Sequence, residues 1–215
     1  MKLHPASAAL LGGLILAGSA HAAPVVVDFE TPNSFASIAE HYNGGTDSLG
    51  LAGVNLGVSF GLDALALRND ELGPYFSNAE GLGVLSAVGA ESTMNVAAGF
   101  TGVASVLYAG NAVANVGIWS GLNGTGTRLG QFELSANSAG CAVNTPLCVF
   151  TTASFDLGAG VAKSITFGES VSGESAVVFD KVTVAAVPEP GTYALMGLGL
   201  VGIAGVARRR ARNAA

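Results

Sequence analysis

The sequence predicts an all-β protein, an antiparallel β-sandwich or jelly roll, with a short segment of different character at each end. Two observations predict this fold class. Half of the 215 residues are hydrophobic, only 11% are charged and 31 are glycines, so the chain is too apolar for disorder and too rich in glycine for a helical bundle. Short runs also alternate apolar and polar residues, and no long stretch keeps helical spacing.

Residues 1–22 have the three parts of a secretory signal peptide. Lys2 lies near the start, an apolar run extends from Ala8 to Leu16, and Ala20-His21-Ala22 supplies the small residues of a cleavage site. The alternative is an uncleaved anchor, but the apolar run is about nine residues long and a spanning helix needs about 20. We therefore expect cleavage directly after this site.

Residues 23–187 are expected to form the sandwich from short strands joined by turns. The alternating runs are Val25 to Glu30, Asn55 to Phe60, Ala104 to Tyr108, Val113 to Trp119, Ser164 to Phe167 and Val177 to Val184. Turn-forming residues lie between them at Asn43-Gly44-Gly45, Gly121 to Gly126 and Gly158-Ala159-Gly160. Strands separated in this way favour an antiparallel sandwich.

The charge of this domain argues against one class of partner. The whole chain has a formal charge of −6, but most of its basic residues lie in the two terminal segments. Between Pro24 and Val187 there are four basic residues against 14 acidic ones, which gives −10. Binding to nucleic acid requires a basic stripe that neutralises phosphates, so nucleic acid is excluded as the expected partner.

Cys141 and Cys148 are the two cysteines of the chain and lie seven positions apart in a segment of turn formers. In an exported chain this arrangement predicts a disulfide; the alternative is two free thiols. Closure of so short a loop restrains the unfolded chain by roughly 2–3 kcal/mol, which is enough to fix one hairpin and too little to organise a domain.

Residues 188–215 form the second terminal segment. Pro188-Glu189-Pro190 is followed by an apolar run over residues 193–207 and then by a basic cluster, which consists of Arg208, Arg209, Arg210 and Arg212. Fifteen residues at ~1.5 Å each make a helix of about 22 Å, short of a ~30 Å hydrocarbon core but tolerable with local thinning of the bilayer. We expect a short transmembrane helix with the arginines on the cytoplasmic side.

The order of these parts resembles the PEP-CTERM sorting signal of Gram-negative bacteria. This resemblance implies processing by a membrane-embedded exosortase that recognises Pro188, Glu189 and Pro190. It also implies export across the inner membrane, a transient anchor, and a place at the cell surface or in the extracellular matrix with exopolysaccharide and biofilm. The alternative is a plain C-terminal anchor. The middle of the chain bears a looser resemblance to lectin-like sandwiches, which assigns no ligand.

Three carboxylates suggest a calcium site. Alternation places Asp28 and Glu30 on one face of the first strand, and Asp180 falls in phase with valines of the last strand, where a carboxylate needs a partner. If the first and last strands are neighbours, these side chains offer the oxygen ligands that Ca²⁺ prefers. The alternative is that Asp180 accepts hydrogen bonds from turn amides while the others are solvated.

Two further features are candidates for ligand binding. Trp119 is in phase with Gly117 and Asn115 on the less apolar face of its strand, where its ring would stack on a sugar; packing at a core or edge is the alternative. Asn43 to Asp47 offers amide and carboxylate oxygens in a loop for the same ion or a sugar. That loop departs from the EF-hand pattern, and turn chemistry alone also explains it.

Catalysis has little support in the sequence. After removal of the signal peptide His41 is the remaining histidine, so a Ser-His-Asp triad would have to use it, and the Gly-x-Ser-x-Gly elbow is absent. Gly121 to Arg128 lacks the Lys-Ser/Thr pair of a phosphate loop. A glycosidase needs only two carboxylates about 5–10 Å apart, so the acidic residues leave room for one.

We therefore expect a non-enzymatic surface or matrix protein whose acidic ectodomain holds glycans, with calcium as a possible cofactor. Its expected partners are the exosortase, exopolysaccharide and, before processing, the inner membrane. Two alternatives stay open: a secreted carbohydrate-active hydrolase on the same scaffold, and a structural matrix component without a small ligand.

Overall fold

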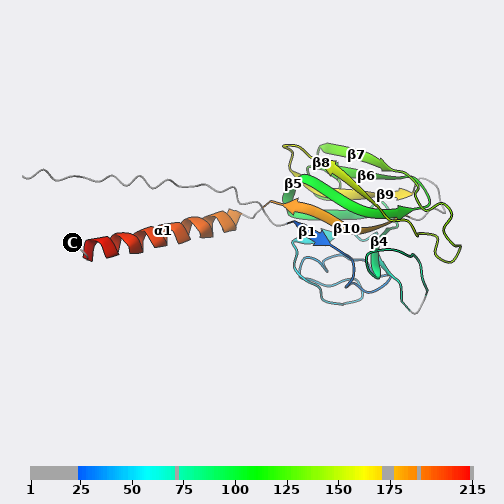
Figure 1. The fold of residues 1–215 in the computed structure, drawn as a ribbon, viewed down its shortest axis with the longest axis horizontal. Helices are drawn as coiled ribbons and strands as arrows, with labels where there is room; N and C mark the ends of the chain where they lie inside the picture. The colour runs from blue at the N-terminus through cyan, green and yellow to red at the C-terminus, as the bar shows by residue number, and fades with distance from the viewer. Residues whose placement is uncertain (1–23, 71–72, 171–176, 188–189, 214–215) are drawn as a thin grey trace, which may run out of the picture.

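The computed structural model describes residues 24–70, 73–170, 177–187 and 190–213 (Figure 1). The signal peptide predicted for residues 1–22 lies outside these ranges. Within them the chain forms ten strands and one helix: β1 (Val25–Val27), β2 (Val58–Phe60), β3 (Ala64–Arg68), β4 (Gly83–Ala87), β5 (Thr93–Gly110), β6 (Ala114–Trp119), β7 (Arg128–Leu134), β8 (Thr151–Asp156), β9 (Ala162–Ser170), β10 (Val177–Ala186) and α1 (Pro190–Asn213).

All of the strand pairs are antiparallel, and they form two layers that share β5. In the first layer the later part of β5 pairs with β8 on one side and β10 on the other; β10 also pairs with β1 and β4, and β4 with β3. In the second layer the start of β5 lies between β2 and β9, and the order continues through β6 to β7. The predicted antiparallel sandwich is thus the fold that forms.

Two glycines mark the place where β5 passes from one layer to the other. Gly99 and Gly102 have φ angles of +84° and +69°, a region that glycine enters without the steric penalty of a Cβ atom. The pairing register of β5 with β9 shifts in the same stretch, as it does at a β-bulge. These bulges bend the strand, so one continuous segment pairs in both layers.

The main core fills the space between the layers. Phe167 of β9 and Phe179 of β10 are both buried, and their ring centroids are 4.8 Å apart although their strands are not hydrogen-bonded neighbours. Phe29, Tyr42 and Phe60 close one end of the core through edge-to-face contacts between their rings. Contact between aromatic rings from opposite layers holds the sandwich together.

A second, smaller core covers the outer face of the first layer. Val84, Ala109 and Val178 point outward from their strands and are buried beneath Phe76 and Leu147, which belong to loop segments. The same loop region contains the disulfide between Cys141 and Cys148, whose Cα atoms are 5.7 Å apart. The pairing that the cysteine spacing predicts is therefore present, and it fixes one of the covering loops.

Two sequence expectations about side-chain direction are wrong. The first strand ends at Val27 because Phe29 has a φ of 58°, so Asp28 and Glu30 do not continue the alternation of a strand. In β10, Lys181 has a φ of 44° and the pairing register with β5 shifts between Asp180 and Thr183. Because this bulge inverts the phase, Asp180 does not share a face with the valines that follow it.

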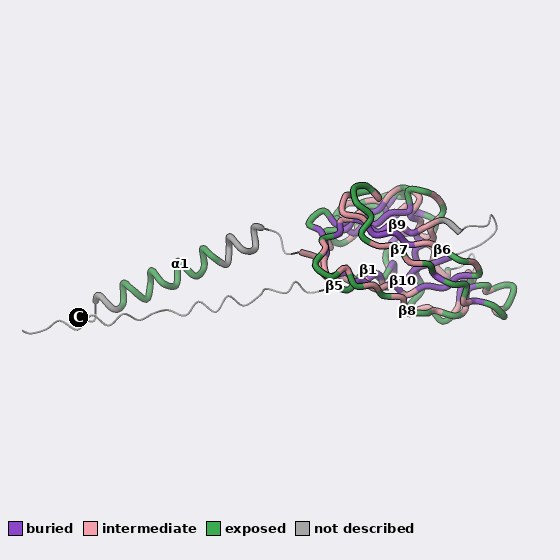
Figure 2. The backbone as a smooth tube through the Cα atoms, turned by 90° about the horizontal axis from the view of Figure 1, so that it is seen from above, coloured by how far each residue is buried: buried purple, intermediate pink, exposed green. Residues whose placement is uncertain are grey.

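Helix α1 forms over the predicted tail and continues through the arginine cluster to Asn213. Its residues 197–210 are exposed (Figure 2). Among the described residues, no helix is long and apolar enough to cross a membrane. The expectation of a transmembrane helix over residues 193–207 is therefore not supported, since glycines interrupt the apolar run and the arginines follow it within the same helix.

Removal of the Phe179 ring should weaken the packing between the two layers and so destabilise the fold. We expect Phe179→Ala to lower the free energy of unfolding by roughly 3 to 5 kcal/mol, because a buried aromatic side chain is lost and a cavity remains. The matched control is Thr152→Ala on the exposed edge strand β8, with an expected change within about 0.5 kcal/mol. Urea unfolding followed by far-UV circular dichroism measures both, and equal losses would contradict the role given to Phe179.

Candidate functional site

The outer face of the second layer carries a row of polar and aromatic side chains that crosses five strands. The inward-facing neighbours of this row, such as Phe60, Met94 and Ile165, are buried in the core. Side chains alternate along each strand, so the residues between them face outward. The pairing registers place these outward residues side by side in the order Ser59, Asn95, Ser164, Trp119 and Arg128.

The turn between β6 and β7 folds back over this row. Asn95 accepts a hydrogen bond from the Asn123 backbone N–H (2.7 Å) and donates one to the Asn123 side-chain oxygen (2.8 Å). Ser164 accepts from the Gly124 N–H (3.0 Å) and donates to the Gly121 carbonyl (2.7 Å). Both anchoring side chains are buried, so the turn is held by satisfied polar groups instead of an apolar core.

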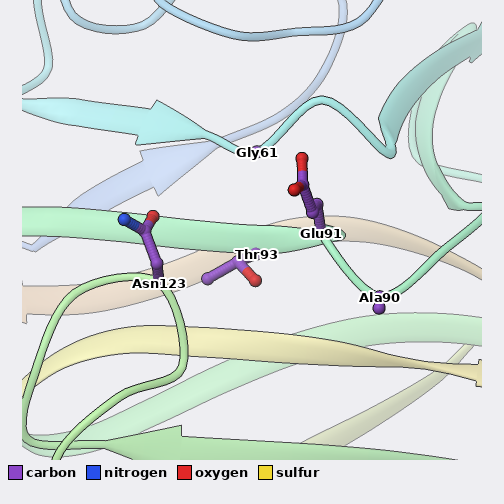
Figure 3. A pocket seen from close by; sticks show the side chains of 5 residues that line it. All are labelled: Gly61, Ala90, Glu91, Thr93 and Asn123. Atoms are coloured by element: carbon purple, nitrogen blue, oxygen red, sulfur yellow. The ribbon is translucent and has the colours of Figure 1, made fainter.

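Two hollows lie on either side of Asn123, which contributes to both. The first has a volume of about 320 Å³, and its lining residues are Gly61, Ala90, Glu91, Thr93 and Asn123 (Figure 3). The second has a volume of about 250 Å³ and is lined by Glu40, Asn43, Gly57, Ser59, Phe60, Asn95, Ala97, Leu122 and Asn123. We call the two hollows together the polar groove.

The lining of the polar groove combines hydrogen-bond donors with acceptors. Amide side chains such as Asn43 and Asn123 supply both, and Ser59 and Thr93 supply hydroxyl groups. Glu40 and Glu91 add carboxylates; the Glu40 carboxylate accepts a hydrogen bond of 2.8 Å from the Asn43 amide. Ala97 and Leu122 give the second hollow an apolar part. This mixture suits a ligand that carries many hydroxyl groups on an apolar ring.

The predicted sugar platform Trp119 lies outside the residues that line either hollow. Its indole N–H donates to the Thr166 hydroxyl at 3.1 Å, and the Arg128 guanidinium lies 5.9 Å from the ring centroid. Trp119 is half-buried, and Gly124 of the folded-back turn approaches it. This geometry favours packing against the sheet, the alternative that the sequence also left open.

The acidic residues proposed for calcium lie where the first and last strands meet. Strand β1 does pair with β10, as that hypothesis requires. The Glu30 carboxylate accepts hydrogen bonds from the backbone N–H groups of Leu82 (3.0 Å) and Gly83 (3.1 Å). Asp28 is exposed and accepts from the Glu30 N–H at 3.3 Å. Backbone amides therefore supply partners that a cation would otherwise provide.

Asp180 is fully buried and only half satisfied. Its Oδ1 accepts a hydrogen bond of 2.7 Å from the Lys181 N–H, whereas Oδ2 has no hydrogen-bond partner in the described structure. Burial, together with the nearby Glu30 carboxylate, raises the pKa of Asp180 to about 6. In the described ranges no three His, Cys, Asp or Glu side chains are grouped to hold a metal ion, so the calcium site stays a prediction.

The first and last residues of the loop from Asn43 to Asp47 have different roles. Asn43 lines the polar groove. Asp47 is buried and accepts hydrogen bonds from the backbone N–H groups of Asn33 (2.8 Å), Leu51 (2.9 Å) and Leu49 (3.0 Å). Burial opposes ionisation, but these three donors outweigh it and lower the pKa of Asp47. Asp47 therefore stabilises the turn through these hydrogen bonds.

His41 is buried, and both of its ring nitrogens have partners. Nδ1 lies 3.0 Å from the Leu51 carbonyl and Nε2 lies 2.9 Å from the Thr31 hydroxyl. Because a carbonyl oxygen only accepts, Nδ1 donates to Leu51, and Nε2 is paired with the Thr31 hydroxyl. The one histidine in the domain is therefore engaged in structure.

The sorting residues lie at the start of α1. Pro188 and Glu189 fall outside the described residues, and Pro190 is the first residue of the helix. Proline at this position fits a helix start, since its missing N–H would have no partner within the helix. Of the basic cluster, Arg208, Arg209 and Arg210 are exposed and Arg212 lies within the helix.

Comparison with known proteins identifies this tail. Residues 186–210 match the family model described as the PEP-CTERM protein-sorting motif. The chain therefore carries this sorting motif, as its residues indicated. The motif implies an exported protein that an exosortase processes and that resides at the cell surface or outside the cell. None of the curated proteins matches the chain.

Two solved structures are similar to the sandwich. The K2 cleaved adhesin domain of Lys-gingipain (Kgp) has a TM-score of 0.49 at 14% identity, over 77% of this chain and 99% of that domain. CBM29_1, a family 29 carbohydrate binding module from Piromyces equi, has a TM-score of 0.41 at 14% identity, over 77% of this chain and 91% of that module.

Sequence reasoning missed most of the polar groove. The turn Gly121 to Gly126 was expected, but nothing in its residues shows that it folds over a sheet. One signal was present: Asn95 is a polar residue between Met94 and Val96, and a buried amide of this kind needs hydrogen-bond partners. Glu40, Ser59 and Glu91 reach the groove from segments distant in sequence.

Because the Asp180 carboxyl is buried, its contribution to the free energy of unfolding should decrease as the pH rises. Its pKa of about 6 exceeds the ordinary value of 3.8, so the folded state binds more protons between pH 4 and pH 6. Stability should therefore fall as pH rises through this window, by roughly 3 kcal/mol for a shift of about 2 units. Asp180→Asn should lose this component.

Thermal unfolding from pH 4 to pH 7 in a chelator measures this dependence for the wild type and the variant. The exposed Glu133→Gln is the control and should keep the wild-type profile. Identical profiles for wild type and Asp180→Asn would show that Asp180 is not the group responsible.

Proposed function

We propose that this chain is a cell-surface or extracellular-matrix protein whose sandwich binds glycans in the polar groove without cleaving them. The observation that carries this proposal is the pair of hollows that meet at Asn123, lined by amides, hydroxyls and carboxylates beside Ala97 and Leu122. A sugar presents hydroxyl groups that both donate and accept hydrogen bonds, around an apolar ring face. Binding sites with a few convergent polar groups in a hollow suit such ligands.

The groove is preorganised for binding. The turn that separates its two halves is fixed by the buried side chains of Asn95 and Ser164, through four hydrogen bonds of 2.7 to 3.0 Å. Asn123 itself has a φ of 53°, a conformation that asparagine tolerates better than most residues. A ligand therefore meets a formed surface, and little ordering entropy is lost on binding.

The sorting motif indicates where in the host the domain would meet its ligand. An exported domain that is held or released at the cell surface meets extracellular polysaccharide, so we propose exopolysaccharide of the biofilm matrix as the ligand in the native host. The formal charge of −10 between residues 24 and 187 favours a dispersed domain over self-association at low salt.

A hydrolase is the alternative that the groove itself suggests. Glu40 lines one hollow and Glu91 the other, so two carboxylates flank Asn123. Glycoside hydrolysis needs two carboxylates on either side of the bond that is cleaved. Release of reducing ends from a bound polysaccharide would favour this alternative, whereas binding without release supports the proposed function; a structural component would show neither.

Filling the second hollow should abolish binding. Ala97 is exposed and lines this hollow, so Ala97→Trp inserts a large side chain without removing any polar group. The control is Ala142→Trp in the exposed disulfide loop. We expect the affinity for exopolysaccharide, measured by affinity electrophoresis of the full chain, to fall at least tenfold in Ala97→Trp alone. Equal binding by both variants would place the ligand elsewhere.

We also propose that Ca²⁺ binds near Asp180, where Glu30 and Asp28 would exchange their hydrogen bonds with backbone N–H groups for contacts with the cation. The buried Oδ2 atom without a partner supports this, because an uncompensated buried carboxylate is costly. Calcium at ten times its dissociation constant should stabilise the wild type by about 1.4 kcal/mol, seen as a higher Tm than in chelator. Asp180→Asn should show no such rise, and no response in the wild type would contradict the site.

A further inference from the structure

Two carboxylates and no basic side chain belong to the lining of the polar groove. Both carboxylates of the groove, Glu40 and Glu91, are exposed at their hollows. Of the four basic residues between positions 24 and 187, none belongs to the lining of either hollow. Arg128 lies over Trp119 and Lys181 pairs with Glu80, so these two side chains are engaged elsewhere.

A third carboxylate, that of Asp63, is hydrogen-bonded to the segment that contributes Glu91 to the first hollow. Asp63 accepts a hydrogen bond of 2.8 Å from the Glu91 backbone N–H, and its main-chain oxygen accepts one of 2.7 Å from Ser92. The turn that presents Glu91 is thus itself anchored by an acidic residue. A negative potential at this end of the groove follows from two acidic residues, Asp63 and Glu91, that are joined by this hydrogen bond.

An acidic sugar would meet two penalties in this groove. A uronate, sulfate or phosphate group would lose part of its hydration without gaining a Lys or Arg partner from the lining. It would also be repelled by Glu40 and Glu91, most strongly at low ionic strength. A neutral sugar meets neither penalty, because carboxylates accept hydrogen bonds from its hydroxyl groups.

We infer that the polar groove selects glycans without acidic groups and rejects polyuronates and sulfated or phosphorylated polysaccharides. This inference rests on the proposed glycan-binding function and specifies its ligand class. Specificity of this kind comes from a repulsive element built into the site as much as from attraction to the preferred ligand. Glu40 and Glu91 are the residues that supply the repulsion.

Matched pairs of oligosaccharides test the inference. The probes are gluco-, manno- and galacto-configured hexasaccharides, each compared with the same chain oxidised at C6 to the uronate, by isothermal titration of the full chain in chelator. The chelator prevents a calcium ion from bridging two carboxylates. We expect at least one neutral member to bind and its uronate partner to bind at least tenfold more weakly, with the gap narrowing in high salt.

The double variant Glu40→Gln/Glu91→Gln removes both charges and keeps the shape of the side chains. The ratio of neutral to uronate affinity should fall toward one in this variant, even if both affinities change. Glu133→Gln, an exposed change on β7, should leave the ratio as in the wild type.

The outcomes separate the inference from the function on which it rests. Equal or tighter binding of the uronate member, lost in Ala97→Trp, would overturn the inference and retain glycan binding in the groove. An unchanged ratio in the double glutamine variant would also overturn it, since the selectivity would then come from other residues. Failure of every neutral and uronate probe to bind would remove the proposed glycan-binding function itself.

Discussion

The bend in strand β5 is the constraint on which the rest of the structure depends. One strand of 18 residues pairs with β8 and β10 in the first layer and with β2 and β9 in the second, and positive φ angles at Gly99 and Gly102 allow the passage between them. Because β5 belongs to both layers, the inner faces of the two layers enclose one common core. The start of β5 also carries Thr93 and Asn95, which therefore face outward beneath the turn that contains Asn123.

The two outer faces of the sandwich differ, and this difference positions the candidate site. Loops cover the first layer with a small apolar core that includes Phe76 and Leu147. The second layer is covered by one polar turn, fixed by buried Asn95 and Ser164. An apolar cover leaves no room for a polar ligand, whereas the polar turn leaves a hollow on each side. The sorting motif and the candidate site thus occupy separate parts of the chain, the tail and this face.

A backbone irregularity in β10 separates the buried Asp180 from the valines that follow it. Asp180 lies on the same side of β10 as Val178, two residues before it, and the bulge at Lys181 turns Val182 and Val184 to the opposite side. The Asp180 carboxylate has one hydrogen-bonded oxygen and one without a partner, and its pKa rises to about 6.

The sequence by itself determined the antiparallel all-β class, most of the strands with strong alternation, the sorting motif and the cysteine pair. These features depend on local periodicity, turn residues and short motifs, which are readable without knowledge of distant contacts. Strands β3, β4, β7 and β8 escaped prediction because their runs are short or lie at exposed edges, where alternation is weak. Tertiary structure alone decided the site, because Glu40, Ser59, Glu91 and Asn123 come together only through strand register and a turn that folds back on the sheet. It also decided the contacts of Trp119, since its partners Thr166 and Arg128 lie on other strands whose pairing no local pattern specifies.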